Sequence, residues 1–197
     1  MTPTVQYVTD ILSFGTVVCD ILIVFLLIVI LTPLSEKGWG RKVATFFGDH
    51  AILFSFLISA GSVVASLFYS EFAHFAPCEL CWIERGLIYP QALILAIAMI
   101  IRKVGNRVSA AKAGEFARKA CLILAGIDFP VSAYHTYLQL GGGAIVPCSA
   151  TGPSCQFVYF IQYGYVTIPS MALTAATLIL LFMLFKQPLS SGTASGK

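Results

Sequence analysis

Five long apolar runs constrain this 197-residue chain more than any other feature. They cover roughly residues 11–32, 51–69, 82–101, 120–140 and 165–185. A helix of about 20 mainly apolar residues crosses a bilayer and satisfies its own backbone hydrogen bonds there. Charged residues make up only 11% of the chain, whereas about 25% is usual in a soluble domain. The runs therefore predict an all-α membrane protein with five transmembrane helices.

The connections between the runs are too short to fold independently, so we expect a single helical bundle. Residues 1–50 would form an additional N-terminal transmembrane helix and a basic cytoplasmic loop. Residues 51–186 would form a four-helix bundle, and residues 187–197 a mobile cytoplasmic tail. The first run is longer than the roughly 7–15 apolar residues of a signal peptide. It also lacks a preceding basic residue and a small-residue cleavage site, so we interpret it as a retained helix.

The basic residues predict the orientation of the bundle. Eleven of the twelve Lys and Arg residues fall in segments that five crossings place on one side: Lys37, Arg41, Lys42, Arg102, Lys103, Arg107, Lys112, Arg118, Lys119, Lys186 and Lys197. Cytoplasmic loops carry the excess of Lys and Arg. We therefore expect an N-terminus outside, a cytoplasmic C-terminus, and outer second and fourth loops. Arg85 alone departs from this pattern.

Four of the six cysteines fall on the predicted outer loops, where disulfides form and persist. Cys78 and Cys81 precede the third apolar run, and Cys148 and Cys155 lie in the fourth loop. The remaining two lie within apolar runs and are interpreted as small hydrophobic residues: Cys19 and Cys121.

The segment "APCELCWIER", residues 76–85, combines two thiols with a cation at the edge of the membrane. If a helix begins near Cys81, its amino-terminal N–H groups and dipole favour a thiolate there. Arg85 lies one turn deeper on the same face, and both effects lower the pKa of a thiol. Glu84 opposes them unless it turns away or pairs with a cation. An unpaired arginine just inside the apolar zone is costly, which indicates a function.

Two other interpretations of the C-x-x-C pair are a stabilising disulfide beside a snorkelling arginine and a zinc site. A bridge across so small a loop stabilises little. No histidine stands at ligand spacing, so we expect no metal. The segment "PCSATGPSC" supplies a second pair, and "GGG" at 141–143 would let its loop move. Two thiol pairs that meet form a relay through mixed disulfides.

The stretch "PCELCWIERGLIYP" resembles the C-x-x-C-x-x-x-R signature of the bacterial disulfide bond formation protein B family. "HTYLQL" at 135–140 and "GYVTIP" at 164–169 resemble the flanks of the second cysteine pair in that family. The similarity covers about residues 51–185. It implies a thiol:quinone oxidoreductase of the bacterial inner membrane that supports disulfide formation in exported proteins. It also implies a soluble thioredoxin-fold dithiol oxidase and the membrane quinone pool, ubiquinone or menaquinone, as partners, and no nucleic acid.

The resemblance also assigns roles to single positions. The residues that it makes catalytic are Cys78, Cys81, Cys148 and Cys155. Cys81 would engage the quinone, and Arg85 would stabilise both the thiolate and the quinone. Cys148 would form the mixed disulfide with the partner. His135 would lie near the quinone, although a histidine that is merely hydrogen-bonded at a helix end is the alternative.

The chain departs from the family pattern in its additional N-terminal helix and in a shorter fourth loop, which resembles the protein C subgroup. Two acids lie within apolar runs, where acids are usually functional. We expect Asp128 to help a proton reach the reduced quinone and Asp20 to tie the additional helix to the bundle. Two alternatives for the function are a quinone reductase like vitamin K epoxide reductase and a non-catalytic membrane subunit with structural disulfides.

Overall fold

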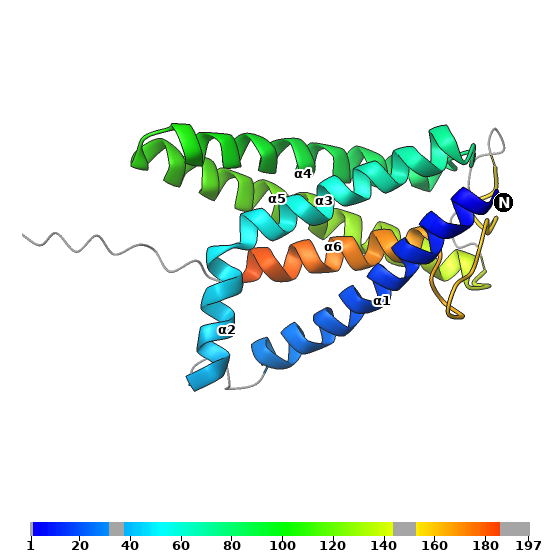
Figure 1. The fold of residues 1–197 in the computed structure, drawn as a ribbon, viewed down its shortest axis with the longest axis horizontal. Coiled ribbons are helices and arrows are strands. Elements are labelled where there is room, and N and C mark those ends of the chain that lie inside the picture. The colour runs from blue at the N-terminus through cyan, green and yellow to red at the C-terminus, as the bar shows by residue number, and fades with distance from the viewer. Residues whose placement is uncertain (1, 32–37, 144–152, 186–197) are drawn as a thin grey trace, which may run out of the picture.

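The computed structural model describes residues 2–31, 38–143 and 153–185, and these residues form helices joined by short connections (Figure 1). In chain order the elements are α1 Pro3–Leu31, α2 Gly38–Asp49, α3 Ala51–Leu67, the π-helical turn η2 Phe68–Phe72, α4 Glu79–Val104, α5 Arg107–Gln139 and α6 Ile168–Leu184. An isolated bridge between Gln162 and Val166 is the only β-pairing within these ranges. The prediction of an all-α protein is confirmed.

Within the residues that the structure describes, three helical segments are long and apolar enough to cross a membrane: α1, α3 continued by η2, and α4. Helix α6 is a shorter apolar helix of 17 residues. Large apolar side chains on the outward faces of the helices are exposed, among them Phe14, Leu93 and Ile123. An apolar outer surface of this kind suits contact with lipid. The chain is therefore a multi-pass membrane protein, and the count of five crossings stays a prediction.

Several helices extend beyond the apolar runs that predicted them. Helix α5 begins at Arg107, where Asn106 caps it by accepting a hydrogen bond from the Ser109 backbone N–H at 2.8 Å. The third connection predicted from hydropathy is therefore almost entirely helix, because polar and alanine-rich residues continue a helix without being apolar. Helix α2 likewise forms inside the predicted first loop.

The core lies between α3, α4, α5 and α6, which pack against one another. Its buried members include Ile52 on α3, Leu95 on α4, Cys121 on α5 and Ile179 on α6. Cys121 is a free thiol that is completely buried among these apolar side chains. This confirms that Cys121 behaves as a small hydrophobic residue.

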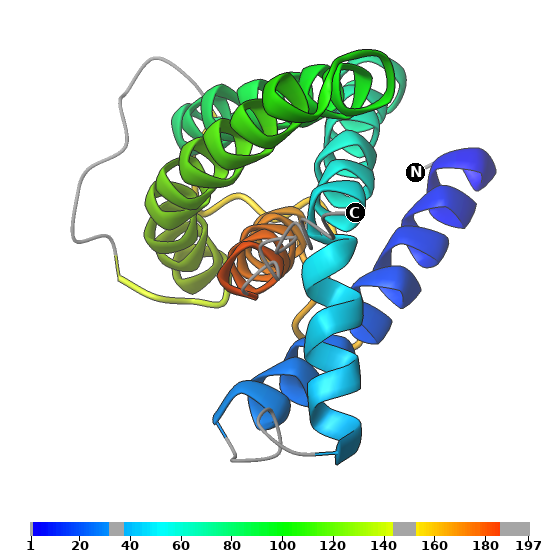
Figure 2. The same ribbon diagram turned by 90° about the vertical axis from the view of Figure 1, so that its left-hand side faces the viewer.

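Helix α1 lies outside this core and packs against α6 (Figures 1 and 2). Asp20 on α1 accepts hydrogen bonds from Thr174 at 2.6 Å and from the Tyr165 hydroxyl at 2.7 Å. The Tyr69 hydroxyl donates to Thr9 at 3.4 Å. The interpretation of Asp20 as a tie between the additional helix and the bundle is confirmed. In Figure 1 the N-terminus lies at the same end of the molecule as the loops that follow η2 and precede α6, and α2 lies towards the other end.

Candidate active site

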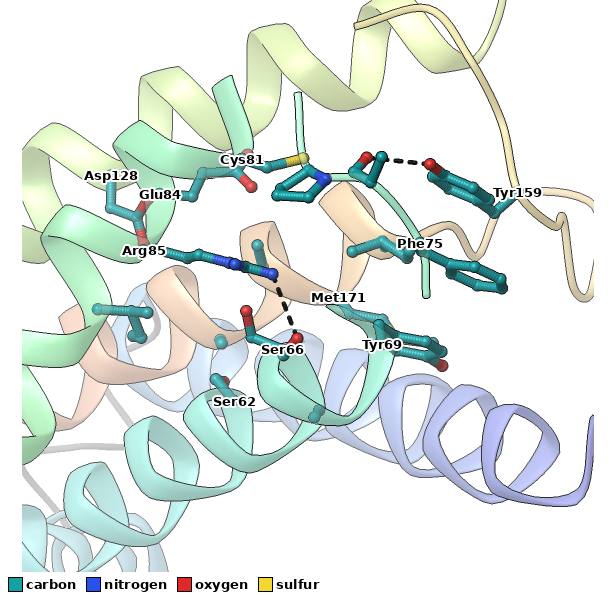
Figure 3. Close-up of a pocket in the computed structure, with 17 residues that line it drawn as sticks. Ser62, Ser66, Tyr69, Phe75, Cys81, Glu84, Arg85, Asp128, Tyr159 and Met171 are labelled. Atoms are coloured by element: carbon teal, nitrogen blue, oxygen red, sulfur yellow. Dashed lines mark hydrogen bonds between the residues drawn. The ribbon is translucent and has the colours of Figure 1, made fainter. Parts of the chain in front are cut away.

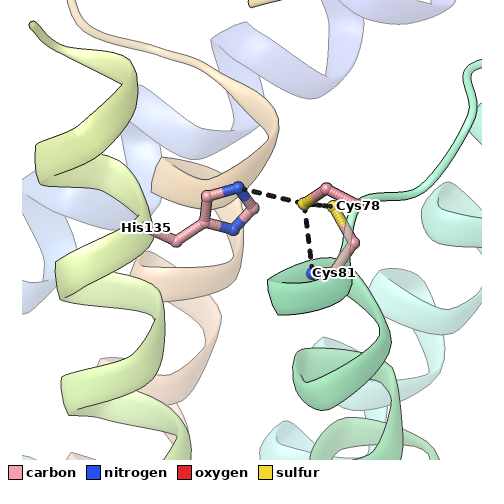
Figure 4. A group of neighbouring side chains, drawn as sticks. All are labelled: Cys78, Cys81 and His135. Carbon is pink, nitrogen blue, oxygen red and sulfur yellow. Dashed lines mark hydrogen bonds between the residues drawn. The ribbon is translucent and has the colours of Figure 1, made fainter. Parts of the chain in front are cut away.

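Cys78 and Cys81 meet at the amino end of α4. The helix begins at Glu79, and Cys78 is its N-cap in an extended conformation. The Cys78 sulfur accepts a hydrogen bond from the Cys81 backbone N–H at 3.4 Å. The two sulfurs lie 2.9 Å apart (Figure 4). The expectation that the helix starts near Cys81 was wrong by one half-turn, so the helix terminus stabilises an anion on Cys78 instead.

His135 and Glu84 complete a chain of contacts that begins at Cys78. His135, which is fully buried on α5, places Nε2 3.5 Å from the Cys78 sulfur and Nδ1 2.9 Å from Glu84 Oε1. When a carboxylate accepts a hydrogen bond from the Nδ1–H group, the Nε2 lone pair of the neutral imidazole is free to take a proton from a thiol. A nucleophile, a base and an orienting carboxylate thus stand in order.

These contacts activate Cys78. The hydrogen bond from the Cys81 thiol, followed by the contact with His135, lowers the pKa of Cys78 to about 4. Burial acts in the opposite direction, because it disfavours the charged form. A Cys78 sulfur in this setting is a thiolate at neutral pH, and the thiolate is the form that attacks disulfides.

Glu84 is the functional residue that sequence reasoning missed. Its charge was expected to oppose a thiolate unless the side chain turned away or paired with a cation, and Glu84 contacts His135. A signal for its position was present in the sequence. The buried face of α4 repeats every three or four residues, and Glu84 belongs to that repeat. Its members are Glu84, Ile88, Gln91, Leu95 and Ala98.

An open pocket of about 770 Å³ adjoins Cys81 between α3, α4 and α6. Its walls are mainly apolar, and the residues with polar groups or rings that line it include Ser66, Tyr69, Phe75, Cys81, Arg85 and Asp128 (Figure 3). An apolar hollow with a few convergent polar groups is the usual form of a small-molecule site. Cys81 therefore faces this mainly apolar pocket, whereas Cys78 and His135 do not line it.

Arg85 supplies the positive charge of this pocket. Its guanidinium donates a hydrogen bond to the Ser66 carbonyl oxygen at 3.3 Å and lies 5.2 Å from the centre of the Trp82 ring. Among the described residues, no carboxylate pairs with Arg85 and no hydrogen bond joins it to Cys81. A cation held in this way can accept an anionic oxygen from a ligand.

Asp128 of α5 supplies a second polar group in this pocket, at the end where Figure 3 shows Glu84 and Arg85. Its side chain is 1% exposed, and within the described part of the chain Oδ1 has no hydrogen-bond partner. A buried carboxyl group without a partner is costly to ionise. In its protonated form Asp128 can donate a hydrogen bond or a proton to a ligand in the pocket.

Cys155 of the second pair lies next to the first pair. It is disulfide-bonded and 1% exposed. With Cys78 and Leu138 it forms one buried cluster, against which Cys81 packs. Cys148 lies outside the described residues. The structure therefore brings one member of the second pair to the first pair.

The segment that carries Cys155 contacts both the stretch before Cys78 and the stretch after α5. The Tyr159 hydroxyl donates to the Ala76 carbonyl oxygen at 2.9 Å, and the Tyr159 ring stacks on Phe75 at 4.1 Å. Gln156 donates to the Gly142 carbonyl oxygen at 3.1 Å. A side chain on Gly142 would collide with the Tyr137 ring, so this glycine permits a close approach of the two segments.

Cys78, Cys81 and His135 also have the composition of a metal site, since their ligand atoms all lie within 4.8 Å of one another. The statement that no histidine stands at ligand spacing thus fails in three dimensions, because folding brings His135 to both thiols. Two thiolates on one tetrahedral zinc ion lie roughly 3.8 Å apart, given zinc–sulfur bonds of about 2.3 Å. The sulfur separation of 2.9 Å is shorter and suits a thiol–thiolate pair that closes to a disulfide.

Comparison with known proteins points to the same chemistry. The sequence model of the family "Disulfide bond formation protein DsbB" matches residues 48–186. Disulfide bond formation protein C of Bacillus subtilis (strain 168) is 37% identical over 132 residues, which are 66% of this chain and 86% of the relative.

Two further relatives carry similar descriptions. A probable disulfide formation protein of Oceanobacillus iheyensis is 38% identical over 144 residues, which are 70% of this chain and 89% of the relative. The SPbeta prophage-derived disulfide bond formation protein B of Bacillus subtilis (strain 168) is 31% identical over 139 residues, or 71% and 83% of the two chains. No solved structure matches the chain significantly. Helix α1 lies outside the region that the family model matches.

Proposed function

Since the chain belongs to the disulfide bond formation protein DsbB family, we propose that it carries electrons from a thioredoxin-fold dithiol protein through two cysteine pairs to a quinone. Membership itself gives an oxidoreductase role in disulfide formation. The observation that carries the finer proposal is the position of the first pair. Cys78 packs with Cys155 on one side, and Cys81 lines an apolar pocket with Arg85 on the other.

The first half of the proposed relay is thiol–disulfide exchange at the second pair. A thiolate of the partner attacks Cys148, forms a mixed disulfide and releases Cys155 as a thiolate. The second thiolate of the partner then attacks its own mixed-disulfide sulfur, so the partner leaves oxidised and Cys148 and Cys155 are both reduced. Two electrons and two protons have moved to this chain.

The second half passes the electron pair to Cys78 and Cys81. The Cys155 thiolate attacks the Cys78 sulfur, and Cys81 leaves as a thiolate that faces the pocket. Cys148 then attacks Cys155, restores the disulfide of the second pair and releases Cys78 as a thiolate. His135, held by Glu84, exchanges the proton of Cys78 at Nε2.

The pocket suits a quinone ring, which when bound supplies an acceptor for two electrons and two protons. The ring would lie against the apolar walls beside Cys81. Arg85 would hold an oxygen that becomes negative, and the unpartnered Asp128 carboxyl would supply a proton. The residues present therefore fit this cofactor: mainly apolar walls, one cation and one buried acid.

Purified protein tests this proposal directly. Mixing it with a quinone and a reduced thioredoxin-fold dithiol protein should consume one quinone for each dithiol oxidised, followed by quinone absorbance and by titration of the partner's thiols. Cys78→Ser and Cys155→Ser should each abolish turnover. Turnover of a quinone epoxide would instead support the reductase alternative. Cysteine pairs that resist reduction by a dithiol, with no quinone consumed, would support a structural role and overturn the proposal.

A further inference from the structure

Helix α2 differs from the other helices in its direction. In Figure 1 it runs across the long axis of the bundle, whereas the other helices run roughly along that axis, and Figure 2 shows it side-on. It lies at the end of the molecule opposite the cysteines, beyond the end of α1. Only its last two residues fall within the region that the family model matches, so the role of α2 is to be sought in this chain's own residues.

One face of α2 packs onto the bundle. The Phe47 ring stacks on Phe182 of α6 with 5.6 Å between ring centroids, and its centroid lies 5.5 Å from that of Phe54 on α3. Gly40 and Gly48 are buried as well. Packing therefore fixes the position and direction of α2 and leaves its other faces for contacts outside the bundle.

Two aromatic side chains form a line along one exposed edge of α2. Trp39 and Phe46 are seven residues apart, which is about two helical turns, and they are 63% and 52% exposed. Trp39 meets Phe25 of α1 edge-on with ring centroids 5.8 Å apart, and Phe46 lies 5.9 Å from Phe54. Because α1 and α3 are apolar enough to cross a membrane, this aromatic edge continues their apolar surface.

The next edge of α2 carries positive charge. Arg41 and Lys42 are exposed, and within the described part of the chain neither forms an ion pair. Successive residues lie about 100° apart around a helix, so Lys42 lies beside the aromatic edge and Arg41 lies farther round, next to Thr45. Cations on one edge and aromatic rings on another are typical of a helix that lies in a membrane surface.

We propose that α2 binds the headgroups of anionic phospholipids through Arg41 and Lys42, with Trp39 and Phe46 at the boundary between headgroups and acyl chains. Three features identify the occupant: cations without a protein partner, exposed rings next to membrane-crossing helices, and a direction parallel to the surface of a membrane that the bundle crosses. Indole rings prefer this boundary, and cations near it attract anionic lipids.

The aromatic edge distinguishes a lipid from other anionic partners. A nucleic acid or an acidic soluble protein would use the two cations of α2 but would leave its exposed rings beside the membrane without a role. The inference is independent of the proposed function, because it involves neither the thiols nor the pocket beside Cys81.

The chain contains a reporter for this surface. Its two tryptophans are Trp39 and Trp82, so Trp82→Phe leaves Trp39 as the only indole. Every protein in the experiment is full-length, carries this substitution and is reconstituted in vesicles of equal parts phosphatidylcholine and phosphatidylglycerol. Bromine on an acyl chain quenches indole fluorescence on contact. Brominating one lipid at a time therefore measures which lipid lies beside Trp39.

Brominated phosphatidylglycerol should quench Trp39 more strongly than phosphatidylcholine brominated at the same positions. A cation near an anionic surface contributes about fivefold to binding, so the preference for phosphatidylglycerol should be about fivefold or more. Arg41→Gln combined with Lys42→Gln should bring this preference close to one. Both side chains are exposed and glutamine is a good helix former, so the fold should be retained.

Arg107→Gln combined with Lys112→Gln is the matched control. It removes the same charge from exposed positions near the start of α5, which lies apart from α2 in both views of the molecule. The lipid preference at Trp39 should not change. An equal loss of preference in the two double variants would mean that the net charge of the protein attracts the lipid without a site, and would overturn the proposal.

Three further outcomes decide the nature of the site. Equal quenching by the two brominated lipids would overturn the proposal. Bromine near the headgroup end should quench more than bromine near the end of the acyl chain, and the reverse order, or no quenching by either, would place Trp39 away from the boundary and overturn it as well. Inorganic phosphate should leave the preference as it is in chloride of the same ionic strength. A preference abolished by phosphate would show a site for the free anion and not for a lipid.

Discussion

Glu84 Oε1 lies 2.9 Å from His135 Nδ1, and both side chains are buried between α4 and α5. This contact fixes which nitrogen of His135 faces Cys78, because Nδ1 is occupied and Nε2 is directed at the sulfur. The first cysteine pair therefore has a histidine and its orienting carboxylate beside it. The base lies one residue before "TYLQL", and the carboxylate lies within the segment that carries the cysteines.

The reactivity of Cys78 should persist into acid solution. Its pKa is lowered from 9.0 to about 4, so the folded, reduced protein holds a thiolate wherever the pH exceeds roughly 5. Iodoacetamide should modify Cys78 at a nearly constant rate from pH 8 down to about pH 5, with a loss as the pH falls through 4. The same cysteine in unfolded protein should lose reactivity below about pH 9. Site-resolved mass spectrometry provides the measurement, and parallel pH profiles in folded and unfolded protein would contradict the assignment.

The stabilising contribution of this thiolate has the corresponding sign. Because the folded pKa lies below the unfolded one, the contribution to the stability of the reduced protein is fully present above about pH 9 and disappears as the pH falls through about 4.

Removing the His135 imidazole should slow thiol–disulfide exchange at Cys78 more than removing the negative charge of Glu84. His135→Ala removes a contact that lowers the Cys78 pKa, so exchange with a small disulfide should become slower at the acid end of the pH range and change less at neutral pH. Glu84→Gln retains an oxygen that can accept the Nδ1 proton but loses the charge, so its effect should be smaller. Stopped-flow exchange against pH provides the measurement. An effect of Glu84→Gln that exceeds that of His135→Ala would show that the carboxylate acts without the histidine.

Arg85 should control quinone turnover without affecting thiol exchange with the partner. Arg85→Ala removes a charge-assisted contact and should lower kcat/KM for a quinone by about 10- to 100-fold. Arg85→Lys keeps the charge but loses the planar guanidinium group, so its activity should lie between those of wild type and Arg85→Ala. Steady-state quinone reduction gives the order, and mixed-disulfide formation with the partner is the control. Wild-type quinone kinetics in Arg85→Ala would remove Arg85 from the site.

Cys155→Ala should trap the partner on this chain. Cys155 is buried, so a folded partner cannot reach its sulfur without movement of the segment, and Cys148 is the expected point of attack. Without Cys155, Cys148 is a free thiol, so the partner is supplied with its resolving cysteine replaced by alanine and its remaining cysteine activated as a thionitrobenzoate disulfide. Cys148 then attacks the partner's sulfur, thionitrobenzoate leaves, and the mixed disulfide persists because no resolving thiol remains. Non-reducing gels and peptide mapping identify the bond. A bond to Cys78 instead would reverse the proposed order of electron flow.

The two ends of the chain should lie in different compartments. The basic residues predict an outside N-terminus and a cytoplasmic C-terminus. Reporter fusions at the two termini, one active only outside and one only inside, provide the test. Activity of the same reporter at both ends would reduce the five predicted crossings to four or raise them to six.

Hydropathy predicted the apolar part of each helix but not where the helix ends. The polar first half of α5 and the whole of α2 are helical without being apolar, and capping by Asn106 rather than hydrophobicity sets the start of α5. The start of α4 is set in the same way by Cys78. The helix begins two residues earlier than expected, so Cys78 and not Cys81 is the thiol that caps its amino end.

The residues of the first pair and the arginine were identifiable from their spacing, because C-x-x-C and an arginine four residues later belong to one local segment. The contact between His135 and Glu84 was not, because it joins residues 51 positions apart on different helices.

The burial of Cys155 in the same cluster as Cys78 bears on how fast the relay can run. Reacting groups held side by side have a very high effective concentration, so their meeting adds little to the barrier. The rate of internal exchange is then not limited by a diffusive search of the loop. Its direction is set by the relative reduction potentials of the two pairs. A longer loop between the pairs would leave such a step unchanged, as long as Cys155 kept its place beside Cys78.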